Sequence, residues 1–316
     1  MKSRQKASLS RRRFVALAAS GVAGAVVCKS GWGAEPSAAA GLELYTVGAD
    51  LEKDPQGTLK KVAAIGYSEV EVSNLGKISA SQWRDWIHEA GLRAPSALLP
   101  FAMEDTGKIL EDAKALGVAY VGSSLFLPHM PQFSSRESAL QTINTATRSL
   151  TEDDFKKMAA MANGFGEKAK AAGLQYVYHN HNFEFRVLGS GVRGYDILLR
   201  ETDPSVVKFE ADCGWMKVGG ADPVALLTQH PERFALVHIK DFKNVTHPVT
   251  IFGAPDGPVP TELGRGSIDL LPIVKAARRI GVRHFYVEQE PPYKEMPPLE
   301  AAAVDYATLH SLLERA

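Results

Sequence analysis

Cysteine is scarce in this chain, which contains only two among its 316 residues. One of them, Cys28, lies in an N-terminal stretch that we expect to be removed, so the mature protein would keep Cys213 alone. A single thiol can form no internal disulfide, even in an oxidising compartment, and cannot build a thiolate-rich metal site. Packing must therefore stabilise the fold.

An excess of charge of either sign is also missing. Lys and Arg together number 36, as do Asp and Glu, so the formal net charge is +0. Such a chain has no overall field that would draw it to nucleic acid or to an anionic membrane, and we expect neither as a partner. The most apolar segment, residues 15–27, is too short and too weakly hydrophobic to span a bilayer. The mature form is predicted to have no membrane span.

The N-terminus is predicted to carry an export signal. Ser10-Arg11-Arg12-Arg13-Phe14-Val15 and the apolar run that follows it are typical of a twin-arginine leader. Residues 29–40 supply a linker that contains the expected cleavage region. We predict a signal peptide and linker over residues 1–40, followed by one domain over residues 41–316. The twin-arginine export machinery is then a partner, and the location is the bacterial periplasm or another extracytoplasmic space.

Strand-like and helix-like segments alternate through the predicted domain. The patterns predict strands over residues 42–47, 68–73, 92–99, 118–123, 174–179, 206–211, 234–239 and 284–287. They predict helices over residues 55–65, 79–90, 105–116, 151–172, 195–201, 223–229, 268–280 and 299–313. Residues 125–150 are expected to form a long loop with a short helix, as a lid. Eight such units predict a single α/β domain, a (β/α)₈ TIM barrel. An open doubly wound sheet is disfavoured, because no Gly-rich phosphate turn follows the first strand.

Four polar stretches come directly after predicted strands in the second half of the chain. They are Tyr178-His179-Asn180-His181, Asp212-Cys213-Gly214-Trp215, His238-Ile239-Lys240-Asp241 and Glu288-Gln289-Glu290. In a closed barrel the carboxyl ends of parallel strands converge on one mouth, so these stretches would form one site. Glu71, near the end of the second strand, can reach the same mouth. The first hypothesis is a metal-dependent enzyme.

These stretches, together with the Glu210-Ala211 that precedes Asp212 and with Leu263-Gly264-Arg265-Gly266-Ser267-Ile268-Asp269, resemble the xylose-isomerase-like TIM barrels. That superfamily includes sugar and sugar-phosphate isomerases and epimerases, inosose dehydratases and apurinic endonucleases. The resemblance implies a divalent metal held by Glu, Asp, His and Glu from successive strand ends. Asp212, His238 and Glu288 match the last three positions. The first position has His179 in place of Glu, and His181 would point to the same face, so either histidine could be the ligand; we favour His179.

Two imidazoles with two carboxylates form a borderline nitrogen and oxygen donor set, which suits Mn²⁺, Zn²⁺, Co²⁺ or Fe²⁺. Such an ion polarises a sugar carbonyl and acidifies the adjacent C–H. Glu288 could then act as ligand and base, with Glu184 or Glu290 as partner, and Lys240 could stabilise the developing oxyanion. The candidate substrate contacts are His181, Trp215, Asp241 and Arg265.

The predicted function is that of a metal-dependent sugar isomerase or epimerase that removes a proton next to a carbonyl. Its substrate is a small carbohydrate, and an unphosphorylated one, because sugar phosphates are scarce outside the cytoplasm. The alternatives are a keto-glycoside lyase or hydrolase, a dehydratase of the same fold, or a non-catalytic sugar-binding module. An apurinic endonuclease is disfavoured, because it would need a basic groove for DNA.

Overall fold

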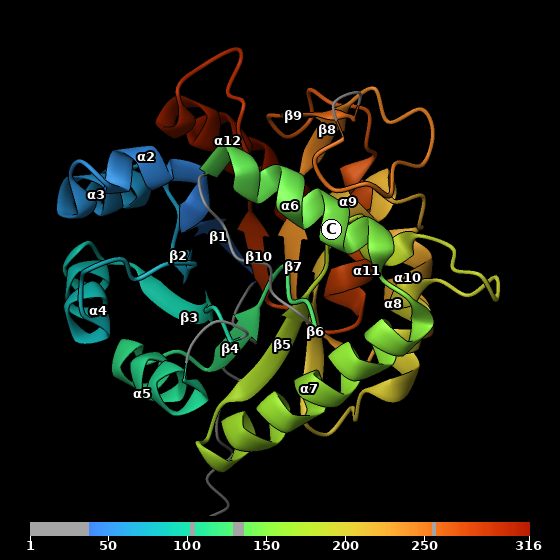
Figure 1. Cartoon of the computed structure of the whole chain (residues 1–316). Coiled ribbons are helices and arrows are strands. Elements are labelled where there is room, and N and C mark those ends of the chain that lie inside the picture. The colour runs from blue at the N-terminus through green and yellow to red at the C-terminus, as the bar shows by residue number, and fades with distance from the viewer. Residues whose placement is uncertain (1–37, 102–104, 129–135, 255–256) are drawn as a thin grey trace, which may run out of the picture. The chain divides into compact units, whose positions relative to one another are not determined.

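Eight parallel strands form a closed barrel in the computed structural model (Figure 1). Around the barrel their order is β1-β10-β7-β6-β5-β4-β3-β2. Their bounds are β1 Ala39–Glu43, β2 Glu69–Val72, β3 Arg93–Leu98, β4 Tyr120–Ser123, β5 Gln175–His179, β6 Val207–Asp212, β7 Phe234–Ile239 and β10 His284–Val287. Most strand residues are buried on both faces, as the apolar runs in the sequence indicate. The predicted (β/α)₈ barrel is thus confirmed.

The structure describes residues 38–101, 105–128, 136–254 and 257–316. Strand β1 begins at Ala39, which pairs with His284 of β10, so the barrel starts two residues before the predicted boundary at residue 41. The twin-arginine motif and the apolar run of the predicted leader lie outside the described residues. The unit that contains the barrel is Ala38–Ala316.

Helices follow the strands and cover the outside of the barrel (Figure 1). The main ones are α3 Pro55–Ile65, α4 Ala80–Glu89, α5 Thr106–Leu116, α7 Glu152–Ala171, α8 Gly194–Glu201, α10 Pro223–Gln229, α11 Leu270–Arg279 and α12 Pro298–Arg315. Helix α7 begins with a capping box, in which the side chains of Thr151 and Asp154 bind each other's backbone N–H groups. No helix in the described ranges combines the length and the apolar character that crossing a bilayer requires.

Several short elements depart from the sequence prediction. The strand expected over residues 42–47 ends at Glu43, because the Glu43 carboxylate accepts a hydrogen bond from the Tyr45 backbone N–H and turns the chain into a 3-10 helix. This turn, η1 Leu44–Val47, leads into α2 Gly48–Leu51. The other elements without a sequence prediction are η2 Phe183–Phe185, α9 Cys213–Val218 and the antiparallel pair β8 Asp241–Lys243 with β9 Val259–Thr261.

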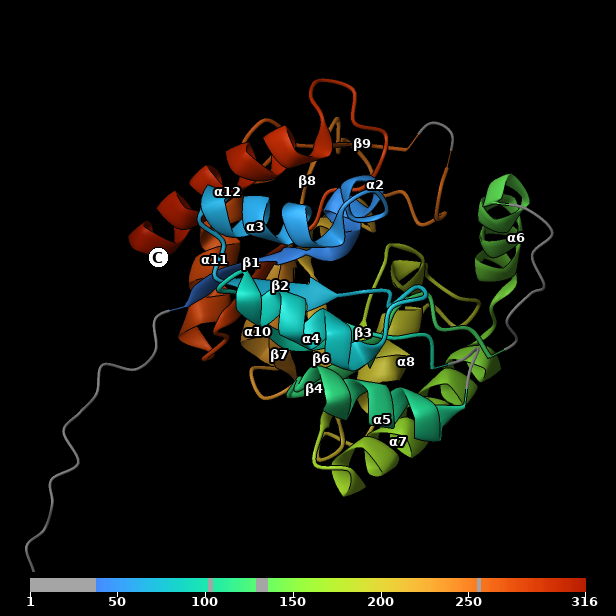
Figure 2. The ribbon, with the colours of Figure 1, turned by 90° about the vertical axis from the view of Figure 1, so that its left-hand side faces the viewer.

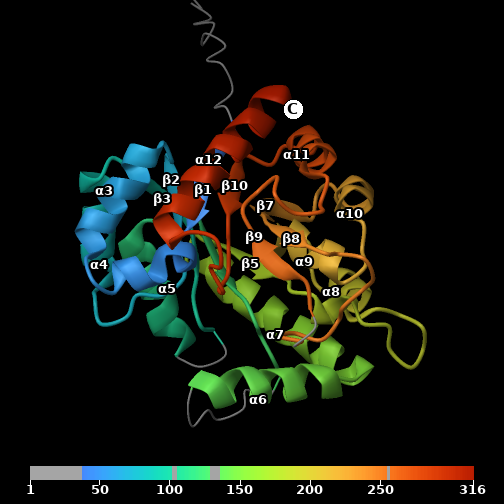
Figure 3. The same ribbon diagram turned by 90° about the horizontal axis from the view of Figure 1, so that it is seen from above.

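Helix α6, Arg136–Ser149, occupies the segment that was expected to be mostly loop. It crosses in front of the barrel in Figure 1 and stands apart from the other helices, on the side to which the strands point, in Figure 2. Figure 3 shows the same separation from above. The side-chain amide of Asn144 donates a hydrogen bond of 2.8 Å to the Phe252 carbonyl. Helix α6 therefore holds a loop at the mouth of the barrel.

Candidate metal centre

Four side chains from neighbouring strands gather at the carboxyl end of the barrel. His179 ends β5, Asp212 ends β6, His238 lies near the end of β7 and Glu288 follows β10. One potential ligand atom from each of the four lies within 4.8 Å of the others. Strand register contributes to this, since Asp212 and His238 are direct partners on β6 and β7. The structure thus brings together the four residues that we predicted as metal ligands.

His179, not His181, belongs to this cluster. The His179 ring has Nδ1 at 3.0 Å from Glu210 Oε2 and Nε2 at 3.7 Å from Asp212 Oδ2. Burial and the neighbouring His238 lower the pKa of His179 to about 3, so its ring is neutral at pH 7. A neutral ring that donates from Nδ1 to Glu210 presents the lone pair of Nε2 to the cluster. The His181 ring lies 5.1 Å from that of His179.

His238 is held between carboxylates on both sides. Its Nδ1 is 2.7 Å from Glu288 Oε2, and its Nε2 is 2.6 Å from Glu71 Oε2 and 3.3 Å from Glu210 Oε1. Burial opposes the charged ring, but Glu210 and Glu71 outweigh it, and the pKa of His238 is raised well above its usual value. His238 is therefore protonated without a metal, and Nδ1 must lose its proton before it can serve as a ligand.

Glu71 and Glu210 form a carboxylate layer beneath the cluster. Both side chains are fully buried, and with His238 they make the second grouping of metal-capable side chains among the described residues. Burial, together with the charge of Glu210, raises the pKa of Glu71 to about 7. Glu71 is the member of this pair that the sequence places near the mouth, whereas no role was predicted for Glu210. The available signal was its spacing from Asp212, because residues two apart on a strand face the same side.

Lys240 places one ammonium group among the carboxylates. Its Nζ lies 3.0 Å from Asp212 Oδ2, 2.9 Å from Glu288 Oε2 and 2.5 Å from Glu290 Oε1. Burial alone would lower the pKa of Lys240, but these carboxylates raise it well above the usual value, so the charge is permanent. Glycine at position 214 makes room for this side chain, since a Cβ there would lie 2.5 Å from the Lys240 Cβ.

The donor atoms of the cluster fit a divalent ion. Metal–ligand bonds to nitrogen and oxygen are about 2 Å long, so ligand atoms on opposite sides of one ion lie about 4 Å apart. The spacing within the cluster needs only small shifts to match this. Asp212 Oδ2 is buried and forms an ion pair with Lys240 at 3.0 Å but no hydrogen bond with the described residues, so a bound ion would share this oxygen with the ammonium group. His179, Asp212, His238 and Glu288 could therefore hold the ion.

Two residues that we predicted to act in the site, Glu184 and Arg265, lie away from the cavity. Glu184 was a candidate catalytic residue, but its carboxylate accepts hydrogen bonds from the His181 backbone N–H and from the hydroxyl of Tyr178 on β5. Arg265 was a candidate substrate contact, but its guanidinium faces Glu262 and Glu295, each at 3.6 Å, and is partly exposed. Neither residue lines the cavity at the cluster.

Asp241, another predicted substrate contact, anchors a loop instead. Its Oδ2 accepts hydrogen bonds from the backbone N–H groups of Gly264 and Gly266, and its Oδ1 accepts from those of Phe242 and Ile268. The carboxylate is buried and its acceptor positions are occupied by these four donors. Gly266 is required here, because any Cβ would collide with the Asp241 carboxylate. The glycines of Gly264-Arg265-Gly266 are therefore explained by the way this loop binds Asp241, not by a role in substrate binding.

Replacing Asp241 with Ala is expected to lower the free energy of unfolding by about 2–4 kcal/mol, because buried backbone donors lose a charged acceptor. Asp241→Asn keeps one side-chain oxygen and should lose about half as much. Urea unfolding with a chelator present, so that bound metal does not contribute, measures both values. Equal midpoints for the wild type and Asp241→Ala would show that the loop does not depend on this carboxylate.

A cavity of about 440 Å³ opens over the cluster. Its described lining includes Glu43, Tyr45, Leu98, His179, His181, Phe252, Glu288 and Glu290. His181, a predicted substrate contact, has its buried Nδ1 without a hydrogen-bond partner among the described residues. Trp215, also predicted as a substrate contact, donates from its indole N–H to Glu290 Oε1 at 2.9 Å and so fixes one carboxylate of this lining.

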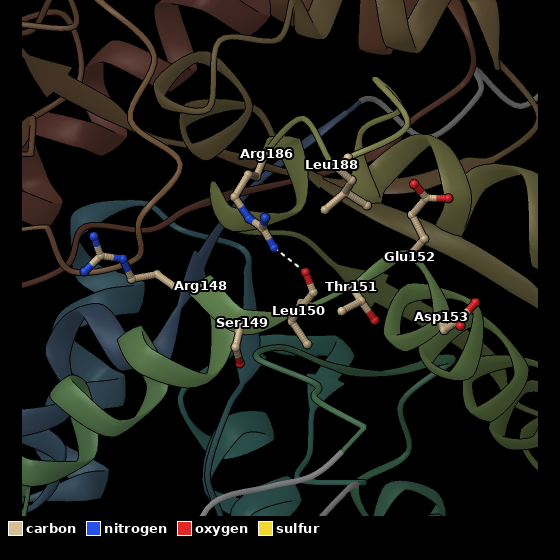
Figure 4. Close-up of a pocket in the computed structure, with 9 residues that line it drawn as sticks. Arg148, Ser149, Leu150, Thr151, Glu152, Asp153, Arg186 and Leu188 are labelled. Carbon is tan, nitrogen blue, oxygen red and sulfur yellow. Dashed lines mark hydrogen bonds between the residues drawn. The ribbon is translucent and has the colours of Figure 1, made fainter.

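A larger cavity, of about 590 Å³, lies elsewhere (Figure 4). It surrounds the junction of α6 and α7, where Arg186 donates a hydrogen bond to the Leu150 carbonyl. Its lining has carboxylates at Glu152 and Asp153 but no histidine among the described residues, and none of the clustered side chains. We therefore place the chemistry in the smaller cavity.

The profile of the xylose isomerase-like TIM barrel family matches residues 59–311. The chain belongs to this family, which confirms the resemblance seen in the sequence. Within it, the inosose dehydratase of Lacticaseibacillus casei is 28% identical over 167 residues, which cover 50% of this chain and 52% of that protein. The inosose dehydratase of Clostridium tetani is 33% identical over 96 residues, which cover 29% of this chain and 30% of that protein. The chain matches about half of these curated relatives' length or less.

Solved structures resemble the chain over a greater length. A sugar phosphate isomerase/epimerase from Parabacteroides distasonis ATCC 8503 is 26% identical, with a TM-score of 0.66 over 88% of this chain and 96% of that chain. An L-ribulose 3-epimerase, 18% identical, has a TM-score of 0.63 over 88% and 95%. The IolI protein, solved with a zinc atom, is 17% identical, with a TM-score of 0.56 over 88% and 98%. The last two similarities show the fold alone.

Proposed function

We propose that this protein is a metal-dependent isomerase or epimerase that removes a proton next to the carbonyl of an unphosphorylated sugar. The observation that carries the proposal is the cluster of His179, Asp212, His238 and Glu288, two of which, His179 and Glu288, line a cavity large enough for a small ligand. The nitrogen and oxygen donors favour Mn²⁺, Zn²⁺, Co²⁺ or Fe²⁺. Family membership adds support, because the relatives named above are sugar- and inosose-processing enzymes.

The side chains around the cluster can move a proton. A bound divalent ion would polarise the substrate carbonyl and make the adjacent C–H more acidic. Glu288 lines the cavity, and although burial opposes its charge, the Lys240 ammonium group at 2.9 Å holds its pKa well below the usual range. It is therefore an ionised carboxylate that can accept a proton from carbon. Lys240, fixed by three carboxylates, supplies the positive charge that stabilises a developing oxyanion.

The charges around the cavity argue for an unphosphorylated substrate. Among the described residues that line it, none is lysine or arginine, whereas Glu43, Glu288 and Glu290 bring carboxyl groups to its wall. A sugar phosphate carries close to two negative charges and would need basic partners for its phosphate group. The twin-arginine leader predicted from the sequence favours the same substrate class, since an exported enzyme would meet few sugar phosphates. We propose the periplasm or another extracytoplasmic space as its location.

A dehydratase is the second candidate, and the similarity to two inosose dehydratases favours it. Dehydration begins with the same proton removal next to a carbonyl and then expels a hydroxyl group from the following carbon. The two reactions therefore share the cluster and differ in what happens after the proton is lost. Products separate them, because an isomerase or epimerase keeps every oxygen and a dehydratase releases water.

The proposal predicts about one divalent transition metal per chain and metal-dependent entry of solvent deuterium into a keto-sugar. Elemental analysis of the purified protein measures the first, and NMR in D₂O of a panel of keto-sugars measures the second. Fructose and fructose 6-phosphate make a matched pair within that panel, and we expect the phosphate to be handled less well. Chelation should abolish exchange, and metal should restore it. Tight sugar binding without any exchange would contradict the proposal and support a non-catalytic binding module.

A further inference from the structure

A second cavity adjoins the cavity over the metal cluster. It has a volume of about 330 Å³ and shares Phe252 and Glu290 with the first cavity, so the two meet along a common wall. The rest of its described lining is largely apolar and includes Trp215, Val218, Val249, Ile251, Pro260 and Pro292. Two unlike compartments therefore lie side by side, one with the ligand cluster and one with apolar and aromatic walls.

The common wall is held firmly in place. Glu290 Oε1 accepts hydrogen bonds from Lys240 Nζ at 2.5 Å and from Trp215 Nε1 at 2.9 Å. The Trp215 backbone N–H donates to Asp212 Oδ1 at 2.7 Å, which ties the backbone of this residue to a member of the metal cluster. The Trp215 ring packs against the Phe252 ring, with 5.8 Å between their centroids. A ligand that crosses this wall would meet prearranged groups on both sides.

We propose that the second cavity binds the aglycone of a keto-glycoside, an apolar group with a flat aromatic face that stays attached to the sugar, while the sugar ring with its carbonyl lies over the metal cluster. The proposal deepens the proposed function and rests on it for the position of the ring. A free monosaccharide does not need the second cavity, because the first already lies within the range of about 300–1,000 Å³ that is typical of small-ligand sites.

The chemistry of the second cavity selects the aglycone class. Its proline, valine and isoleucine side chains offer no hydrogen-bonding groups to the hydroxyls of a second sugar. Trp215 and Phe252 offer aromatic surface, against which a flat ring can pack. Its polar side chains are Glu290, which is already held at the common wall, Lys294, and Asn182, whose amide N–H groups donate to the carbonyls of Val249 and Ile251 and whose Oδ1 accepts no hydrogen bond from the described residues. An aromatic aglycone buries apolar surface against Trp215 and Phe252, whereas the described side chains offer the several hydroxyls of a second sugar few partners beyond Asn182, Glu290 and Lys294.

The test compares phenyl and methyl glucosides of the same anomeric configuration, in both configurations, by titration calorimetry on the full-length, metal-loaded protein. The wild type is expected to bind the phenyl glucoside about tenfold tighter or more. Ile251→Trp fills the second cavity and should bring the affinity for the phenyl glucoside down to that for the methyl glucoside. Val187→Trp is the matched control, because Val187 is exposed and lines neither cavity. It should keep the full preference.

Equal affinities of the wild type for the two glucosides would overturn the proposal, and this holds whether or not Ile251→Trp folds. An unchanged preference in folded Ile251→Trp would also overturn it, as would tighter binding of cellobiose than of the phenyl glucoside. Deuterium exchange into free keto-sugars is measured in parallel. Exchange without a phenyl preference would refute the aglycone site alone, whereas a phenyl preference without exchange would refute the proposed function alone.

Discussion

Replacing Glu288 with Gln is expected to reduce solvent deuterium incorporation into the keto-sugar by about 10³-fold or more. Glu288 combines two tasks, because its Oε2 lies in the ligand cluster next to His238 Nδ1 and Lys240 Nζ while its side chain lines the cavity. An amide of the same shape can neither accept a proton from carbon nor supply the negative charge that balances a divalent ion.

The measurement is NMR exchange at a metal concentration that saturates the variant, so that loss of the base is separated from loss of the metal. Glu295→Gln is the control, because it makes the same chemical change at an exposed carboxylate that pairs with Lys243 and Arg265 and lines neither cavity. The control should exchange at the wild-type rate. If fully loaded Glu288→Gln stays within about tenfold of the wild type, another residue is the base.

The fold could be predicted from the sequence wherever apolar periodicity determines the element. Strands β7 and β10 have the predicted bounds, and the other barrel strands except β1 differ from the prediction by one or two residues at an end. The prediction fails where a single side chain redirects the backbone. Glu43 turns the chain after β1, and Asp212 begins α9 by accepting from the Trp215 backbone N–H. An apolar pattern reports burial but carries no information about such local hydrogen bonds.

In the candidate site, too, the strand pattern predicts some positions, whereas local hydrogen bonds determine others. The convergence of His179, Asp212, His238 and Glu288 follows from the strand ends alone, because parallel strands in a closed barrel bring their carboxyl ends to one mouth. The positions of Glu184 and Asp241 could not be predicted from the strand ends. Both stand close in sequence to the ligand residues and have suitable chemistry, yet backbone N–H groups occupy their carboxylates. Proximity in sequence to a catalytic motif therefore does not show which donors a carboxylate will meet in the fold.

Glu210 connects the two predicted histidine ligands from below. Its Oε2 is 3.0 Å from His179 Nδ1, and its Oε1 is 3.3 Å from His238 Nε2. A ring that donates a proton to a carboxylate on one side is held in one tautomer and orientation and becomes a better ligand on the other side. Because Glu210 is fully buried and lines neither cavity, its effect on the reaction must pass through the histidines. It is a positioning residue.

Glu210→Gln is accordingly expected to weaken the binding of Co²⁺ or Zn²⁺ by about 10–100-fold, while the number of ions per chain stays the same. Competition against a chelator of known affinity measures the first quantity, and the visible spectrum of the Co²⁺ form reports any change in ligand geometry. Glu69→Gln is a closely matched control, since Glu69 is also a buried carboxylate next to a histidine, His284, but lies at the amino end of β2.

The number of ions per chain also tests whether Glu71, Glu210 and His238 hold an ion of their own. In that case the wild type would bind a second ion, and Glu210→Gln would lose it while the first kept its affinity. The contacts favour a positioning layer, because Glu71 Oε2 already lies at hydrogen-bond distance, 2.6 Å, from His238 Nε2. Unchanged affinity in Glu210→Gln, with an unchanged Co²⁺ spectrum, would show that the histidines keep their orientation without this carboxylate.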